Sequence, residues 1–179
     1  KILDRLKGRL SYLEKNGSLA KNYVNIMYNY DAIQKNPDLF RKIMKEEILA
    51  KNRNIDPDEL DRIIDDSFPI IKSLKNYYNR PRPSQVNAKI KPFSSSTAST
   101  PSYPSGHAFQ AFLIAKHLSK KYPFRTFKFY SIAERIAKAR VSAGLHYPSD
   151  NDAGMLLSAA IWEDIKYKIK APHQYGGHG

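Results

Sequence analysis

Hydrophobic residues along this chain recur at intervals of three and four positions, the spacing that places them on one face of an α-helix. The pattern starts with Leu3, Leu6, Leu10 and Leu13. It predicts helices within residues 2–13, 19–30, 36–52, 56–68, 70–78, 105–121, 126–143 and 149–169. No alternation long enough for a β-strand and no internal repeat is visible. We therefore predict an all-α protein, with one helical domain over residues 1–179.

Capping signals mark where several of these helices begin. Asn36 and Asp56 are candidate N-caps, and a proline follows each at the first helical position. Ser149, with Asp152 three residues later, predicts a capping box of the acidic variant. Pro69 predicts a break or kink between two helices, because proline lacks the backbone donor.

Two stretches depart from the helical pattern. Residues 79–104 are rich in Pro, Ser and Thr and predict a long loop. A loop of more than about 15 residues inside a compact domain is usually functional or disordered. Residues 171–179 predict a frayed tail without a functional role.

Composition narrows the chemistry. The chain has 179 residues, enough for a domain with a buried core, and none is cysteine. Disulfides, a thiol nucleophile and a cysteine metal site are therefore excluded. The longest uncharged apolar stretches, 108–115 and 153–162, are far shorter than the roughly 18 residues of a membrane span. We expect no integral membrane association. No signal peptide is visible at the start of the sequence, and the compartment stays open.

The excess positive charge is concentrated in one part of the sequence. The net charge is +13, and residues 71–140 contain 14 Lys and Arg with a single acidic residue, Glu134. Such a segment concentrates anionic ligands. By itself the charge also fits a basic face that binds nucleic acid or acidic lipid without chemistry.

Three short motifs lie in or beside this basic segment: "KNYYNRPRP", "PSGH" and "ARVSAGLHYPSD". They contribute the candidate site residues Lys75 and Arg82, then Ser105, Gly106 and His107, then Arg140, His146 and Asp150. Taken singly, most have an ordinary explanation, such as a surface charge, a helix cap or a surface hydrogen-bonded pair. Arg140 is harder to explain in this way, because a guanidinium on an otherwise apolar helix needs a partner.

The cationic members of the set suit a phosphoryl group, whose oxygens share negative charge. Arg82 and Arg140 each offer a planar fork to phosphate, and Lys75 adds a point charge. A helix that begins near Ser105 directs backbone N–H groups toward an anion. Gly106 allows the ligand to approach the backbone closely.

The remaining three residues suit phosphoryl transfer. His146 is the candidate nucleophile, and Asp150 can accept the hydrogen bond from its other ring nitrogen and fix the tautomer. His107 is then free to protonate the leaving oxygen.

In order and spacing, the three motifs resemble the signature of the type 2 phosphatidic acid phosphatase and vanadium haloperoxidase superfamily. They look most like its soluble class A nonspecific acid phosphatases. The resemblance covers about residues 72–154. It uses Arg82, because seven residues before Arg80 lies Ser73 rather than lysine. Ala139 stands where the family usually has serine, which removes one hydroxyl near the phosphate site.

The resemblance implies a helical bundle with the site at one end and a metal-independent phosphomonoesterase that acts through a phosphohistidine on His146. It implies no cofactor, inhibition by vanadate, a small phosphorylated substrate, and a periplasmic or secreted location. Because relatives often dimerise, it leaves a homodimer open, and it disfavours nucleic acid as a partner. Two alternatives remain: a haloperoxidase with vanadate as cofactor, and a basic helical module that binds nucleic acid.

Overall fold

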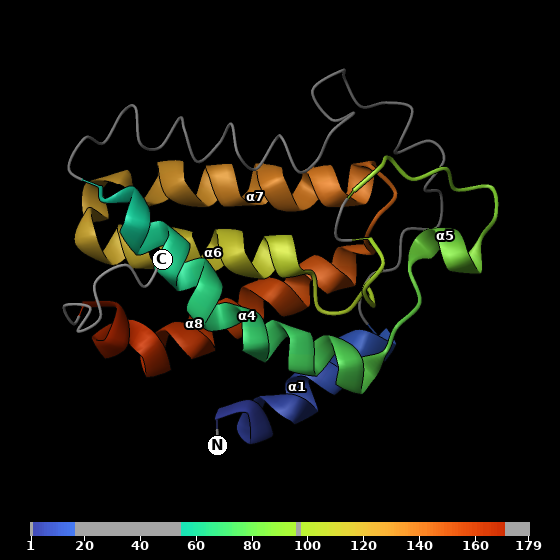
Figure 1. Ribbon diagram of the computed structural model, residues 1–179, viewed down its shortest axis with the longest axis horizontal. Helices are drawn as coiled ribbons and strands as arrows, with labels where there is room; N and C mark the ends of the chain where they lie inside the picture. The colour runs from blue at the N-terminus through green and yellow to red at the C-terminus, as the bar shows by residue number, and fades with distance from the viewer. Residues whose placement is uncertain (1, 17–54, 96–97, 171–179) are drawn as a thin grey trace.

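The computed structural model describes residues 2–16, 55–95 and 98–170. Its elements are α1 (Ile2–Asn16), α4 (Pro57–Tyr78), α5 (Pro83–Val86), α6 (Gly106–Lys121), the 3₁₀ helix η2 (Pro123–Arg125), α7 (Thr126–Ser142) and α8 (Pro148–Lys170) (Figure 1). This part of the chain contains no strand, so the predicted all-α class is confirmed. The helices predicted at 19–30 and 36–52 and the predicted tail at 171–179 lie outside the described residues.

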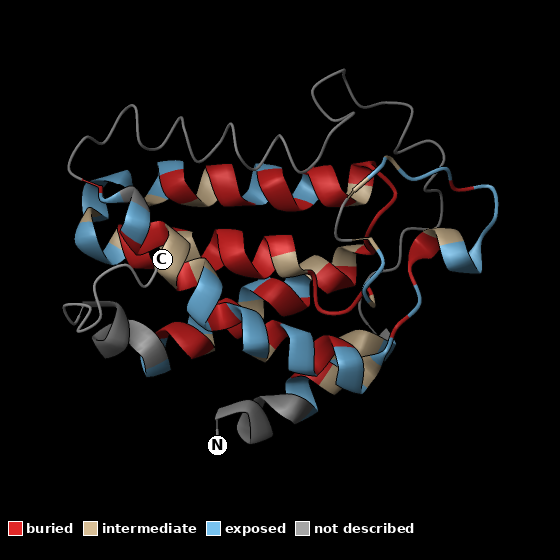
Figure 2. Cartoon of the chain, in the orientation of Figure 1, coloured by how far each residue is buried: buried red, intermediate tan, exposed pale blue. Residues whose placement is uncertain are grey.

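Helix α6 is the centre of the described bundle and packs against α4, α7 and α8 (Figure 1). It is buried along most of its length, whereas α7 shows both buried and exposed faces (Figure 2). Its buried residues are His107, Ala108, Phe109, Gln110, Ala111, Phe112, Leu113, Ala115, His117 and Leu118. Burial of each large apolar side chain stabilises the fold by about 1.5–3 kcal/mol. Because α6 packs against three helices, the position of its start, where "PSGH" lies, is fixed from several sides.

Helix α4 begins as predicted and continues further than predicted. Asp56 is its N-cap, and its side chain accepts a hydrogen bond from the backbone N–H of Asp58. Of the break or kink predicted at Pro69, the break is wrong, because Pro69 lies inside the helix. A proline removes only one backbone donor, and Ile63 and Ile71 are buried on either side of it. Packing of the turns that flank Pro69 therefore keeps the helix continuous to Tyr78.

The described part of the predicted loop contains one short helix, α5. One backbone hydrogen bond closes the loop on itself, from Ser102 N–H to the Arg80 carbonyl (2.9 Å). Two others tie this part of the chain to distant elements: Phe93 N–H to the Ala143 carbonyl (3.0 Å) after α7, and Ser105 N–H, just after the loop, to the Asp150 carbonyl (3.0 Å) of α8. The loop thus runs across the end of the bundle where α6 and α8 begin. This arrangement brings the three sequence motifs together.

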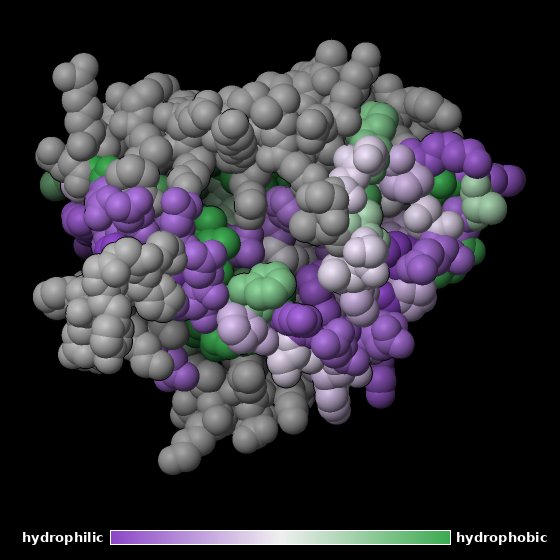
Figure 3. Space-filling model, viewed as in Figure 1, coloured by the Kyte–Doolittle hydropathy of each residue, from purple (hydrophilic) through white to green (hydrophobic). Residues whose placement is uncertain are grey.

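The described surface in the view of Figure 3 is mostly hydrophilic, with smaller hydrophobic areas between the charged side chains. No helix in the described part of the chain is long and apolar enough to cross a membrane.

Candidate active site

A pocket of about 460 Å³ lies between α4, the loop before α6, and the start of α6 itself. Five of the eight predicted site residues line it: Lys75, Arg82, Gly106, His107 and His146. The other three, Ser105, Arg140 and Asp150, are fully buried. Residues that span 72 positions of the sequence therefore meet at one concave place.

One wall of the pocket is apolar and is formed by Ile64, Phe68 and Ile71 of α4. Phe68 is half exposed, so its ring lies at the open side of the pocket, while Ile71 is buried. A charged floor therefore adjoins an apolar wall.

The start of α6 is built by the local sequence, as predicted. Ser105 is the N-cap, and its hydroxyl accepts a hydrogen bond from the backbone N–H of Ala108 at 3.2 Å. Gly106 and His107 follow in the first turn and reach the pocket. A Cβ on Gly106 would lie 3.7 Å from Lys75 Cε, so the lysine stem passes beside the helix N-terminus. The positive end of the helix dipole and the ammonium group thus share one side of the pocket.

Lys75 and Arg82 are held by backbone and loop groups. Lys75 Nζ donates to the Pro101 carbonyl at 2.7 Å. Arg82 donates through Nε to the Thr100 carbonyl at 2.8 Å and through Nη1 to the Leu145 carbonyl at 3.1 Å. Burial, followed by the charge of Arg82, lowers the pKa of Lys75 to about 7. Burial also lowers the pKa of Arg82. An anion bound between them would stabilise the charged form of both side chains.

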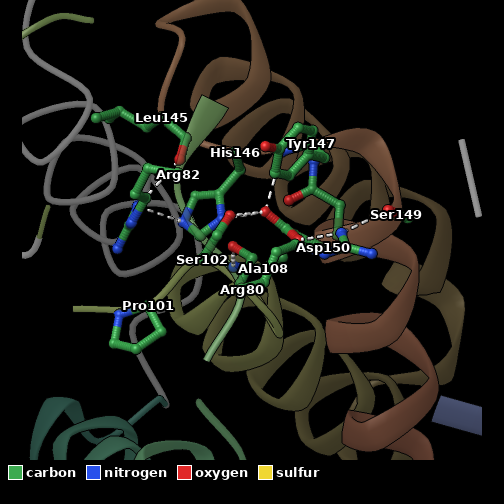
Figure 4. Close-up of polar contacts among 12 residues, drawn as sticks. Arg80, Arg82, Pro101, Ser102, Ala108, Leu145, His146, Tyr147, Ser149 and Asp150 are labelled. Atoms are coloured by element: carbon green, nitrogen blue, oxygen red, sulfur yellow. Dashed lines mark hydrogen bonds and ion pairs between the residues drawn. The ribbon is translucent and has the colours of Figure 1, made fainter. Parts of the chain in front are cut away.

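His146 lies on the pocket floor between a donor and an acceptor (Figure 4). Its Nδ1 is 2.8 Å from Asp150 Oδ2, and its Nε2 is 3.1 Å from Arg82 Nη1. An arginine can only donate, so Nε2 accepts and the ring proton resides on Nδ1. Burial, followed by the charges of Arg82 and Lys75, lowers the pKa of His146 well below 6.5. The ring is therefore neutral at neutral pH, with its Nε2 lone pair toward the pocket.

Asp150 is fully buried, and both of its carboxylate oxygens have partners. Oδ2 accepts from the Ser102 hydroxyl and from the Tyr147 backbone N–H (2.9 Å), besides contacting His146. Oδ1 accepts from Arg80 Nη1 at 2.7 Å (Figure 4). Burial raises the pKa of Asp150 to about 6, against the opposing effects of the hydrogen bond from Ser102 and the charge of Arg80.

The predicted capping box at Ser149 and Asp152 is wrong. Helix α8 begins at Pro148, which places Ser149 inside the first turn. The equivalent contact is made two residues earlier, where the Asp150 carboxylate accepts the backbone N–H of Tyr147. Asp150 therefore both shapes the start of α8 and orients His146.

Arg140 is fully buried in α7, and its Nη2 donates to Ser95 Oγ at 3.3 Å. It is among the charges that lower the pKa of His146 and of Lys75. Ala139 beside it is also fully buried. Arg140 thus contributes positive charge from behind the pocket without being one of the residues that line it.

Sequence reasoning missed Arg80 and Ser102, which both contact Asp150. Arg80 lies two positions before Arg82, and it does not fit the spacing of the first motif. Ser102 lies three positions before Ser105 in the loop. Residues two apart in an extended segment point to the same side, so the spacing of Arg80 and Arg82 gave no signal that they contact different partners. For Ser102 the sequence carried no signal.

The charged residues at the pocket suit an anion. Within the described part of the chain, no group of three or more His, Cys, Asp and Glu side chains could hold a metal ion. Lys75 and Arg82 present positive charge to the pocket, and Arg140 adds more from behind it. A phosphoryl group fits this donor set, and a cation does not.

The profile of the PAP2 superfamily matches residues 67–167, more than half of the chain. The chain belongs to the PAP2 superfamily. A search of curated proteins found none that matches it. Among solved structures, a transmembrane PAP2-type phosphatidylglycerolphosphate phosphatase from Bacillus subtilis is similar at 20% identity and a TM-score of 0.52. The similarity covers 86% of this chain and 85% of that one, and it supports the PAP2 fold.

Membership of the PAP2 superfamily confirms the predicted family and the prediction of a phosphatase-type enzyme. The basic helical module that binds nucleic acid is therefore set aside. The narrower resemblance to soluble class A acid phosphatases stays a prediction, because the similar solved structure is that of a transmembrane phosphatidylglycerolphosphate phosphatase.

Proposed function

We propose that this PAP2 chain is a metal-independent phosphomonoesterase that forms a phosphohistidine on His146. One observation carries the proposal. The Nε2 lone pair of His146 faces the pocket while Asp150 holds Nδ1 at 2.8 Å, which is the geometry of an oriented nucleophile.

Binding of the substrate would exchange one hydrogen bond for others. In the free protein Arg82 Nη1 donates to His146 Nε2. A phosphate oxygen is a stronger acceptor than an imidazole nitrogen, so Arg82 turns its donor to the phosphate and frees the lone pair. Lys75 and the first turn of α6 bind the other oxygens, and the dianion keeps Lys75 protonated.

The transfer then breaks the P–O ester bond as the N–P bond forms. The electron pair of the broken bond goes to the leaving oxygen, which takes a proton from His107. Asp150 stabilises the positive charge that develops on the His146 ring. In the second half, His107 removes a proton from water, the water oxygen attacks phosphorus, and the N–P bond breaks to release phosphate and neutral His146.

No metal is needed in this proposal, because Lys75, Arg82 and Arg140 neutralise the charge on the phosphoryl oxygens. Vanadate would bind the same groups as a five-coordinate mimic and inhibit. The apolar wall of Ile64, Phe68 and Ile71 supports a substrate whose alcohol portion is at least partly apolar.

The experiment that tests this proposal traps the intermediate. Protein is mixed with labelled phosphomonoester and quenched in alkali, in which phosphohistidine survives. Wild type and His107→Asn should retain label from a p-nitrophenyl ester, and His146→Ala should retain none while keeping its circular dichroism spectrum. Label on His146→Ala at the wild-type level would show that another residue is the nucleophile.

A further inference from the structure

Arg80 is a buried cation outside the predicted site, with only 7% of its surface exposed. Its Nη1 donates to Asp150 Oδ1 at 2.7 Å and to Ser149 Oγ at 2.8 Å. His146 contacts the other carboxylate oxygen, Oδ2. Asp150 therefore lies between the candidate nucleophile on one side and the Arg80 guanidinium on the other.

The guanidinium itself is fixed from several directions. Its central carbon lies 4.5 Å from the ring centre of Tyr103 and 5.1 Å from that of Tyr147, the geometry of cation–π contacts. Its far side faces α1, where Nη2 donates to the Glu14 carbonyl and Nε lies 3.6 Å from the Glu14 carboxylate. A side chain held in this way cannot follow a movement of Asp150, so it imposes a position on the carboxylate.

We propose that Arg80 is a positioning residue for His146: it orients the Asp150 carboxylate and keeps it ionised, and Glu14 of α1 tunes this effect. The proposal rests on the proposed function, because it assigns Arg80 a role in making His146 nucleophilic. It extends the site to α1, which contributes none of the predicted residues.

Several groups share the surroundings of Asp150. They are His146 and Tyr147 beside it, Ser102 and Tyr103 from the loop, and Lys75, Arg80 and Arg82 from the first motif and the residues around it. Among them Arg80 is the cation in direct contact with the carboxylate. With Arg80 in place the pKa of Asp150 is about 6. Removal of the adjacent positive charge raises a carboxyl pKa by about one to three units.

The direction of the effect on catalysis follows. Protonation of Asp150 removes the acceptor for Nδ1–H and thus the tautomer with its lone pair on Nε2. Loss of the Arg80 charge raises the pKa of Asp150, so the carboxylate is protonated at higher pH. It raises the pKa of His146 as well, for the same reason. Loss of the Glu14 carboxylate does the reverse, because that charge opposes Arg80. The two substitutions therefore shift the acidic limb of the rate profile in opposite directions, which a purely structural role of Arg80 does not predict.

The test is the pH dependence of kcat/KM for wild type, Arg80→Gln, Arg80→Lys and Glu14→Gln, with Arg62→Gln of α4 as the matched control. The midpoint of the acidic limb should rise by about one to three pH units in Arg80→Gln. It should fall by a fraction of a unit in Glu14→Gln. It should stay near the wild-type value in Arg80→Lys, with a lower plateau, and in Arg62→Gln it should be unchanged.

A folded Arg80→Gln protein with an unmoved limb would overturn the role of Arg80. If Arg80→Gln does not fold, Glu14→Gln and Arg80→Lys test the role of Arg80 instead. An acidic limb that does not move in Glu14→Gln, or one that moves to higher pH in Arg80→Lys, would overturn that role. Trapping of phosphate in the same variants separates this outcome from failure of the proposed function. Wild type without trapped phosphate contradicts the phosphohistidine, whereas trapped phosphate with an unmoved limb contradicts only the role of Arg80.

Discussion

A Cβ on Gly154 of α8 would lie 2.9 Å from the backbone nitrogen of Phe109 in α6, closer than real side chains pack. It would also lie 3.1 Å from the carbonyl oxygen of Ser105. The absence of a side chain therefore sets how near α8 approaches the start of α6. One turn before Gly154, the Asp150 carbonyl accepts the Ser105 N–H at 3.0 Å. This close approach joins the helix that carries His107 to the helix that orients His146.

Gly154→Ala should therefore lower both stability and activity. The obstructing atoms are backbone, so the helices must separate by a few tenths of an ångström, and overpacking of this kind costs about 1–3 kcal/mol. Denaturant unfolding measures the loss of stability, and kcat under folding conditions measures the misplacement of the site. Gly8→Ala is the control, since nothing lies within 4 Å of its Cβ. That helical substitution should stabilise by about 0.5–1 kcal/mol and leave kcat unchanged. A Gly154→Ala protein as stable and active as wild type would contradict the argument.

His107→Asn should harm substrates in proportion to how badly their leaving group needs a proton. For an alkyl phosphate the loss in kcat/KM should be about 10²- to 10⁴-fold, because an alkoxide leaves poorly. For p-nitrophenyl phosphate it should be much smaller, because that phenolate leaves without help. Steady-state kinetics on both esters measures the difference. Equal losses on the two substrates would mean that His107 binds phosphate and that another group is the acid.

Lys75 should give the rate profile an alkaline limb near pH 7. Its pKa is lowered to about 7, so in the free protein it loses its charge as the pH rises through that value, and affinity for phosphate falls. In Lys75→Arg the cation stays charged, and the limb in kcat/KM for p-nitrophenyl phosphate should move to higher pH. Lys72→Arg, at the rim of the same pocket, should keep the wild-type limb. A limb that stays in place in Lys75→Arg would assign it to another group.

Activity should persist in excess EDTA and be lost to low concentrations of vanadate. The reason is the cationic donor set, in which Lys75 and Arg82 supply the charge that a metal ion would otherwise supply. The measurement is the initial rate with chelator, with chelator followed by Mg²⁺ or Zn²⁺, and across a vanadate titration. Activity that disappears with EDTA and returns with either metal contradicts the metal-independent mechanism.

Phe68 should make the enzyme sensitive to the apolar part of its substrate. For alkyl phosphates of increasing chain length, kcat/KM should rise in wild type, since each buried methylene contributes about 0.8 kcal/mol at most. The rise should flatten in Phe68→Ala, which removes part of the apolar wall. Phe127→Ala removes an exposed ring that does not line the pocket, and it should keep the wild-type slope. A flat response in wild type would show that the wall does not bind the leaving group.

Local interactions made much of this protein predictable from its sequence. The Ser105 cap, the Asp56 cap and the bounds of α6 and α7 depend on contacts within a few residues, so they were predicted to within a residue or two. The hydrogen bond between His146 and Asp150 was also predicted, because the two residues lie four positions apart and one turn brings them together. The resemblance of the three motifs to the superfamily signature predicted that these residues would meet, and five of the eight line one pocket.

Tertiary packing decided the rest. Arg80 reaches Asp150 across 70 positions of the sequence, and Ser102 does so across 48, so no local spacing encodes either contact. The start of α8 moved away from its predicted cap because the Asp150 carboxylate accepts the Tyr147 N–H. Helix α4 passes through Pro69 because its buried face packs on both sides. The sequence determined the helices and the chemical groups, whereas the folded chain alone determined the surroundings of Asp150, since a buried charge takes its partners from every element packed against it.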